Sequence, residues 1–222
     1  MDAQRRSNAH YDCDAHQYER DVDHGITPEQ RPHWDRDLDP IIERWMSPDA
    51  PVVDVGVGTG VLATIMAEKG FKVDGIDPSI EMLKKANEQL SDFVASGQVT
   101  LFEADTHIAE LPPSRYGAVV TRQVVCHLRD PLMAFRRWYE WLRPGGTVLV
   151  IDAYWMREDW EGGEFEPDVD SLPLCCVQSA GTLSYLLEQA GFSIEHRGLM
   201  EHVNQLMELR RSRYVVVARK SE

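Results

Sequence analysis

Pro51-Val-Val-Asp-Val-Gly-Val-Gly-Thr-Gly-Val-Leu-Ala63 is the stretch that decides the fold of this 222-residue chain. Its β-branched run, which begins at Val52, predicts a buried parallel strand. A tight glycine turn then leads into a helix predicted over residues 61–69. Gly56, Gly58 and Gly60 carry no Cβ, so a nucleotide-like ligand can lie against the turn, near the positive end of the helix dipole.

The spacing of the glycines distinguishes two kinds of nucleotide site. A dinucleotide fingerprint requires its third glycine at position 61, which is Val61 here. The motif present is Asp54-x-Gly-x-Gly-x-Gly60, and it resembles the first motif of class I S-adenosylmethionine (SAM) dependent methyltransferases. The resemblance implies that Asp54, Gly56, Gly58 and Gly60 hold SAM. A plain connection from strand to helix is the alternative for a glycine turn considered alone.

Length, composition and charge narrow the class of protein. The length fits one α/β domain with an extension, and the net charge of −14 disfavours a nucleic-acid partner. No apolar run reaches the length of a membrane span, and the N-terminus lacks the apolar core of a signal peptide. We therefore expect a cytoplasmic protein with a small-molecule partner, no membrane partner and reduced cysteines. The sequence leaves the oligomeric state open, and a homodimer is possible.

Residues 1–48 are predicted to form an N-terminal helical extension, and residues 49–222 the SAM-binding domain. Apolar side chains at helical spacing over residues 39–46 predict a helix that packs on the sheet edge and ends near Ser47-Pro48. In the methyltransferases that the chain resembles, this segment often covers the cofactor, which implies a lid. Its histidines are spaced by six, eight and nine residues, which gives no i, i+4 pair on a helix face. No metal site is therefore expected.

A carboxylate follows the second predicted strand, residues 71–77, and precedes a helix predicted over residues 78–90. Asp77 matches the position where a carboxylate accepts two hydrogen bonds from a ribose diol, and adjacent parallel strands place it beside the glycine turn. The alternative is that Asp77 caps the helix that opens at Pro78, a role that also suits Ser79. The resemblance implies that Met82 offers an apolar wall to adenine, although a Met at helical spacing is often a core residue.

The third and fourth predicted strands, residues 99–105 and 116–123, end in further polar side chains. In the family, an acidic residue at the end of the third strand commonly binds the adenine amino group. The resemblance therefore implies that Asp105 binds adenine and that Thr106 lies beside it. The tip of the fourth strand would face the methionine end of SAM and its reactive methyl group. Three residues gather there: Arg122, Gln123 and His127.

Candidate catalytic residues come from this tip and from the extension. The fork of donors on Arg122 suits a carboxylate of the cofactor or of the substrate. His127 suits general-base work, although a structural, hydrogen-bonded His is the alternative. Tyr11 and Tyr18 are predicted to help hold the acceptor. Residues 153–178 form an acidic, aromatic insert that is predicted to line the substrate site, since loops after parallel strands line the ligand crevice; a solvated charged loop is the alternative.

The last third of the chain is predicted to supply the strands that complete the sheet. Leu142-Arg-Pro-Gly-Gly146 and residues 147–152 resemble the turn and fifth strand of the same family. Residues 179–191 predict a helix with Ser179 as N-cap and Gly191 as its stop. Residues 192–198 and 212–219 predict a closing hairpin, which adds an antiparallel member. We therefore predict an α/β, doubly wound, Rossmann-like methyltransferase fold with a seven-stranded, mostly parallel sheet that has one antiparallel strand.

The resulting function hypothesis is SAM-dependent methyl transfer to a small-molecule acceptor by in-line displacement. Two alternatives share the fold. One is an enzyme that uses SAM in non-methyl chemistry, such as intramolecular cyclisation of its aminobutyryl arm. The other is a non-catalytic SAM-binding module.

Overall fold

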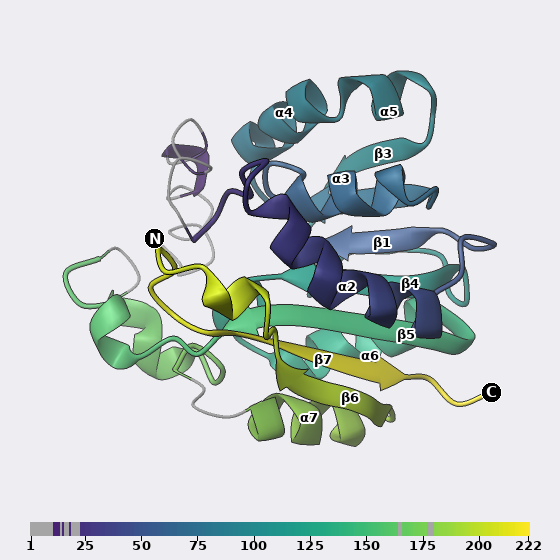
Figure 1. Cartoon of the computed structure of the whole chain (residues 1–222). Helices are drawn as coiled ribbons and strands as arrows, with labels where there is room; N and C mark the ends of the chain where they lie inside the picture. Colours follow the sequence, from purple (N-terminus) through teal and green to yellow (C-terminus); the bar gives the residue numbers. More distant parts are fainter. Residues whose placement is uncertain (1–10, 14, 16–17, 19–22, 164–165, 177–179) are drawn as a thin grey trace.

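Among the residues that the structure describes, a seven-stranded sheet forms the centre of the protein (Figure 1). This computed structural model describes residues 11–13, 15, 18, 23–163, 166–176 and 180–222. The strand order is β3-β2-β1-β4-β5-β7-β6. The strands are β1 (Val52–Val55), β2 (Val73–Asp77), β3 (Val99–Glu103), β4 (Tyr116–Arg122), β5 (Leu142–Ala153), β6 (Ser193–Leu199) and β7 (Arg213–Arg219).

The direction of the strands confirms the predicted sheet. β1 pairs in parallel with β2 and β4, β2 with β3, and β4 with β5. β7 pairs antiparallel with both β5 and β6, so β7 is the one reversed strand among the described residues. The order changes direction between β1 and β4, and in such sheets ligands bind at this switch point, beyond the carboxyl ends of the strands.

Helices cover both faces of the sheet (Figure 1). One face packs against α2 (Arg31–Trp45) and α3 (Val61–Glu68), and against Ala86 of α4 (Ile80–Gln89). The other face packs against α6 (Pro131–Trp141) and α7 (Ala180–Gln189). The shorter elements are α5 (Ser91–Ala95) and the 3-10 turns η2 (Val125–His127), η3 (Arg157–Asp159), η4 (Glu166–Ser171) and η5 (Val203–Gln205).

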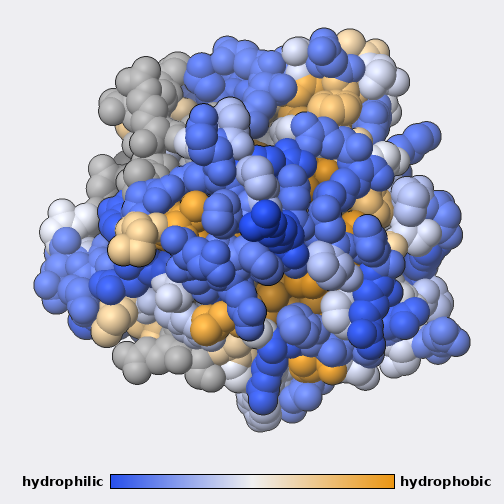
Figure 2. All heavy atoms as spheres, in the orientation of Figure 1, coloured by the Kyte–Doolittle hydropathy of each residue, from blue (hydrophilic) through white to orange (hydrophobic). Residues whose placement is uncertain are grey.

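Successive side chains of the central strands alternate between the two faces of the sheet, so each strand contributes to both hydrophobic cores. In β5, Leu149 and Ile151 face the α2 and α3 side, whereas Val148 and Val150 face the α6 and α7 side. Successive side chains of a strand point to opposite faces, so a strand covered on both faces is apolar throughout. The face of the molecule shown in Figure 2 is mostly polar, with small hydrophobic patches between hydrophilic residues. No helix of the described part of the chain is long and apolar enough to cross a membrane.

Two details of the predicted helices are wrong. The helix predicted over residues 39–46 begins at Arg31, and it contains Pro40. Burial of Trp34 and Leu38 in the core outweighs the backbone hydrogen bond that an internal proline removes. The helix also packs against core residues of β1, β4, β5 and β7 and not on the sheet edge, as its position over the central strands shows (Figure 1). The Ser179 cap lies outside the described residues.

The predicted turn before the fifth strand lies within β5. The register jumps from the pair Tyr116 and Leu142 to the pair Ala118 and Thr147, so the residues between bulge out of the ladder. Gly145 takes a left-handed backbone there, with φ of 70°. The helix stop at Gly191 also has a left-handed backbone, with φ of 106°.

Candidate active site

The glycine turn lies at the switch point of the sheet, between β1 and α3. Gly56 and Gly58 have φ values of 66° and 54°, in the left-handed region that favours glycine. A Cβ on Gly56 would lie 2.4 Å from Cγ2 of Val124, so a side chain there clashes with the loop after β4. A Cβ on Gly58 would meet nothing closer than 3.9 Å. The turn is therefore packed at Gly56 and open at Gly58.

Asp77 connects β2 to this turn. One carboxylate oxygen accepts the backbone N–H of Gly58 at 2.9 Å, and the other accepts the N–H of Ser79 at 2.8 Å. Burial raises the pKa of Asp77 to about 6, and the two backbone N–H groups oppose this rise. The hydroxyl of Ser79 caps α4 by accepting the N–H of Met82 at 3.1 Å. Both residues thus contribute to this helix terminus, and the Asp77 carboxylate also faces the cleft.

Arg122, at the end of β4, and Asp54, in β1, lie near each other. Burial raises the pKa of Asp54 to about 8, and the positive charge of Arg122 counteracts part of the rise. Asp54 Oδ2 has no hydrogen-bond partner among the described residues. Arg122 donates to the backbone oxygen of His24 and lies over the ring of Trp34, with 5.6 Å from guanidinium to ring centroid. The cation is therefore fixed between the extension and the sheet.

Asp105 follows β3 and binds a neighbour that the sequence analysis overlooked. One oxygen of Asp105 accepts both the backbone N–H and the Nδ1–H of His107, each at 2.8 Å. Despite the opposing effect of burial, these bonds lower the pKa of Asp105. The hydroxyl of Thr106 accepts the indole N–H of Trp138 at 2.8 Å, so this hydroxyl is used inside the protein.

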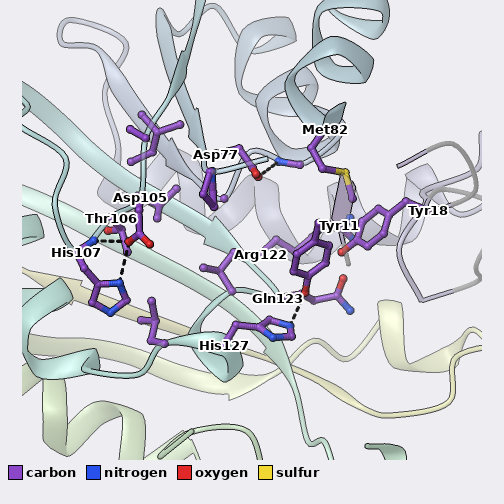
Figure 3. Close-up of a pocket in the computed structure, with 18 residues that line it drawn as sticks. Tyr11, Tyr18, Asp77, Met82, Asp105, Thr106, His107, Arg122, Gln123 and His127 are labelled. Carbon is purple, nitrogen blue, oxygen red and sulfur yellow. Dashed lines mark hydrogen bonds and ion pairs between the residues drawn. The ribbon is translucent and has the colours of Figure 1, made fainter. Parts of the chain in front are cut away.

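Most of the residues described so far border one cleft, here called the main cleft, whose space of about 740 Å³ is partly open to solvent (Figure 3). The main cleft brings together most of the predicted site residues: Tyr11, Tyr18, Gly56, Gly58, Asp77, Pro78, Met82, Asp105, Thr106, Arg122, Gln123 and His127. Asp54 is not part of its lining but borders a smaller pocket against the glycine turn. Gly60 borders neither and is the N-cap of α3, with φ of 98°.

Tyr11 and His127 form a hydrogen-bonded pair at one end of the main cleft (Figure 3). The Tyr11 hydroxyl lies 2.8 Å from Nε2 of His127. Burial raises the pKa of Tyr11 well above its ordinary value, so the phenol stays neutral, and it donates to Nε2 in the His127 tautomer that carries its proton on Nδ1. The indole ring of Trp160 packs edge-on against His127, with 5.4 Å between ring centroids.

A second cavity, here called the side chamber, adjoins the main cleft and encloses about 1000 Å³. Tyr11, Tyr18, Gln123 and His127 line both cavities. The rest of the side chamber is lined by His24, Cys126, Trp155, Glu158, Asp159, Trp160 and Arg210. Ligands in the two cavities would therefore meet beside the Tyr11 and His127 pair.

Sequence reasoning missed several lining residues, among them His107, His24 and Arg210. His107 could have been found, since it follows a strand-end carboxylate by two positions. His24 and Arg210 have no such signal, because only the packing of distant segments brings them to the side chamber. Among the described residues, no three His, Cys, Asp or Glu side chains lie close enough to hold a metal ion.

The strand order is combined with an acidic residue and a glycine turn at the switch point of the sheet. These features define the class of the protein as a methyltransferase-like α/β domain. A sequence model of the family described as a methyltransferase domain matches residues 29–197. The chain belongs to this family, and the resemblance to class I SAM-dependent methyltransferases is confirmed.

Two relatives and one solved structure are among the similar proteins. Phosphoethanolamine N-methyltransferase 1 of Arabidopsis thaliana is 31% identical over 151 residues, which cover 67% of this chain and 30% of the relative. Ubiquinone biosynthesis O-methyltransferase of Xanthomonas campestris pv. campestris is 34% identical over 114 residues, 51% of this chain and 47% of the relative. The chain thus spans less than half the length of either relative.

The solved structure shares the fold. Haemonchus contortus phosphoethanolamine N-methyltransferase 2, in complex with phosphomonomethylethanolamine and S-adenosylhomocysteine, matches with a TM-score of 0.69 at 21% identity. The match covers 95% of this chain and 58% of that chain.

Proposed function

We propose that this protein transfers a methyl group from SAM to a small-molecule acceptor. The observation that carries the proposal is the junction of the main cleft and the side chamber at Tyr11, Tyr18, Gln123 and His127. Such a junction lets a donor and an acceptor approach each other within one enclosed site. Family membership and the S-adenosylhomocysteine bound to the Haemonchus enzyme support the same donor.

The residues of the main cleft fit SAM. The open side of Gly58 leaves room for a ligand against the turn. Each Asp77 oxygen accepts one backbone N–H and keeps a second lone pair, so both oxygens can accept from a ribose diol. Met82 and Pro78 supply an apolar wall beside them. The Arg122 cation suits the carboxylate at the methionine end, with Asp54 and Gln123 as polar neighbours.

At the adenine end, Asp105 has the matching acceptor. Both bonds from His107 reach Oδ1, which leaves Oδ2 for the adenine amino group. Thr106 would contribute packing at this end, because its hydroxyl already accepts from Trp138. The lowered pKa of Asp105 keeps it ionised at neutral pH, as an acceptor must be.

The chemical step uses the Tyr11 and His127 pair. SAM supplies a methyl group that is already activated on a sulfonium sulfur. The acceptor lone pair forms a bond to the methyl carbon, while the bond from that carbon to sulfur breaks and leaves its electrons on sulfur. The acceptor proton passes to the Tyr11 oxygen as the Tyr11 proton passes to His127 Nε2. Positioning of the two ligands supplies most of the remaining rate.

Two segments complete this proposal. Residues 153–178 line the acceptor site through Trp155, Glu158, Asp159 and Trp160, which border the side chamber. In the predicted extension, Tyr11 and Tyr18 serve as the cover over the ligands. Since α2 is part of the core, this covering role is limited to residues that precede it. A cytoplasmic location, the absence of nucleic-acid and membrane partners, and a homodimer all stay predictions.

The test is a calorimetric titration of the protein and of Asp77→Ala with SAM and with S-adenosylhomocysteine. We expect wild-type binding at micromolar concentrations and a loss of about 100-fold or more in Asp77→Ala, because a charge-assisted pair of hydrogen bonds is removed. Asp92→Ala, an exposed acid on α5, is the control and keeps its affinity. Unchanged affinity in Asp77→Ala contradicts the ribose assignment. Product analysis then separates the reactions: S-adenosylhomocysteine reports methyl transfer, and methylthioadenosine reports aminobutyryl chemistry.

A further inference from the structure

We propose that the acceptor bound in the side chamber is a cationic amine that carries no phosphate group. This inference rests on the methyl-transfer function proposed above and names its substrate class. It departs from the phosphorylated amine in the name of the Arabidopsis relative. Three features of the chamber carry it: aromatic walls, arginines already matched by acids, and a buried amide with unused hydrogen-bonding atoms.

Aromatic rings form much of the chamber wall. Tyr11, Tyr18, Trp155 and Trp160 all border it. The rings meet edge-on, with centroids 6.1 Å apart for the two tyrosines and 6.2 Å for the two tryptophans. Aromatic rings attract ammonium groups through their negative faces, and they tolerate the methyl groups that successive transfers add. The wall therefore suits an amine both before and after methylation.

Among the described residues, the arginines near the chamber are paired with carboxylates. Arg210, the arginine in its lining, binds Asp23. Asp23 also accepts from the fully buried Arg213 at 2.7 Å, and Arg213 covers a face of Trp155. Arg211 binds Asp159 through two bonds of 2.7 and 2.8 Å. A phosphate in the chamber would compete with these carboxylates for the arginine donors, so these pairs disfavour a phosphorylated acceptor.

Glu158 adds a negative charge to the chamber. Its nearest described cation is Arg211, at 3.8 Å, and this guanidinium already holds Asp159 in shorter bonds. The Glu158 side chain is 59% exposed, so solvent screens its effect. Its sign nevertheless favours a cation over an anion at the entrance of the chamber.

Gln123 supplies an independent sign of a ligand. It is 6% exposed and has a left-handed backbone, with φ of 58°. Neither its amide oxygen nor its amide nitrogen has a hydrogen-bond partner among the described residues. A buried amide without partners costs free energy, so such a residue is usually satisfied by something that binds. Its oxygen can accept an ammonium N–H at the junction of the two cavities.

The Tyr11 and His127 pair fits this substrate. An ammonium has no lone pair for attack, so it must first lose one proton to the pair. The neutral amine then attacks the methyl carbon, and the product is again a cation, the N-methylated ammonium. Substrate and product thus share the charge that the chamber favours.

The test compares choline with phosphocholine, which differ only by the phosphate, on protein saturated with S-adenosylhomocysteine. Choline cannot accept a further methyl group on nitrogen, so calorimetry measures binding without turnover. We expect choline to bind and phosphocholine to bind at least about tenfold more weakly. Equal or tighter binding of phosphocholine, tighter binding of catechol as a neutral phenol, or no binding of choline overturns the inference. Failure of S-adenosylhomocysteine to bind would instead contradict the proposed function.

Two variants and one matched control test whether choline binds in the side chamber. Glu158→Gln is expected to weaken choline binding about two- to fivefold, as for a solvent-screened charge. Glu161→Gln, an exposed acid of the same loop outside the chamber lining, should leave it unchanged. Trp160→Leu is expected to weaken choline binding about tenfold while the affinity for S-adenosylhomocysteine is retained. Retained choline affinity in both Glu158→Gln and Trp160→Leu would overturn the assignment of the side chamber.

Discussion

The hydroxyl of Tyr11 lies 2.8 Å from Nε2 of His127, although the two residues are 116 positions apart in the chain. Burial keeps the phenol neutral, so Tyr11 carries a proton that it can donate to Nε2. The pair therefore joins the segment before α2 to the loop after β4 at the junction of the two cavities. A contact of this kind can both close the site and accept a proton from the substrate.

Tyr11→Phe separates these two roles. Loss of the hydroxyl leaves the ring in place but interrupts the proton path, so we expect kcat to fall about 100-fold with an unchanged affinity for S-adenosylhomocysteine. Tyr185→Phe, at an exposed position of α7, serves as the control and should keep full activity. A kcat equal to that of the wild type would show that Tyr11 only covers the site.

Gly56→Ala should destabilise the protein by about 2–4 kcal/mol, because a left-handed backbone and a clash with Val124 act together. Gly70→Ala shares the left-handed backbone, with φ of 86°, but its Cβ would meet nothing within 4 Å. The control should therefore lose only about 1 kcal/mol. Urea unfolding measures both variants.

A second substitution tests the clash directly. Val124→Ala shortens the side chain that the new methyl group meets, so it should recover part of the stability of Gly56→Ala. Purely additive losses in the double variant would mean that backbone strain alone explains the effect.

Asp23→Ala should destabilise the protein by about 3–5 kcal/mol, because it leaves the fully buried Arg213 without its carboxylate. Asp170→Ala removes a surface pair with Arg157, in which the side chains are 82% and 58% exposed. That control should leave the unfolding free energy close to that of the wild type, because solvent screens the exposed pair. Equal unfolding free energies of the two variants would contradict the role of the buried pair.

The pH dependence of the unfolding free energy should reveal the ionisation of Asp54. Its pKa of about 8 in the folded protein lies above the ordinary value of 3.8, so Asp54 stabilises the folded state at low pH and this contribution is lost as the pH rises toward 8. Asp77 and Asp152 show the same sign but complete their change near pH 6. Between pH 6 and 8, the unfolding free energy of the wild type should therefore fall by about 1–2 kcal/mol more than that of Asp54→Asn.

Urea unfolding at several pH values measures this difference. All other titratable groups are common to both proteins, so their contributions cancel in the comparison. Parallel curves for wild type and Asp54→Asn between pH 6 and 8 would show that Asp54 is ionised throughout.

Local sequence patterns were sufficient for the sheet. The apolar run at Val52, the glycine turn and the closing hairpin each predict their elements from neighbouring residues alone. The same patterns place Asp77 at the end of β2 and Asp105 after β3, and parallel pairing brings both to one edge. The beginning of α2 was missed because the helix was predicted from the apolar spacing over residues 39–46 alone, whereas burial of Trp34 extends the helix.

The sequence by itself determined the family, the mostly parallel sheet with one antiparallel strand and the polar residues at the strand ends, because these depend on short-range periodicity and turn chemistry. Only the tertiary structure decided the side chamber. Arg210 and His24 reach it from distant segments, and the pairing of Asp23 with Arg210 and Arg213 sets its charge. A charge is free or neutralised according to what packs beside it, and that neighbour is fixed by the folding of the whole chain.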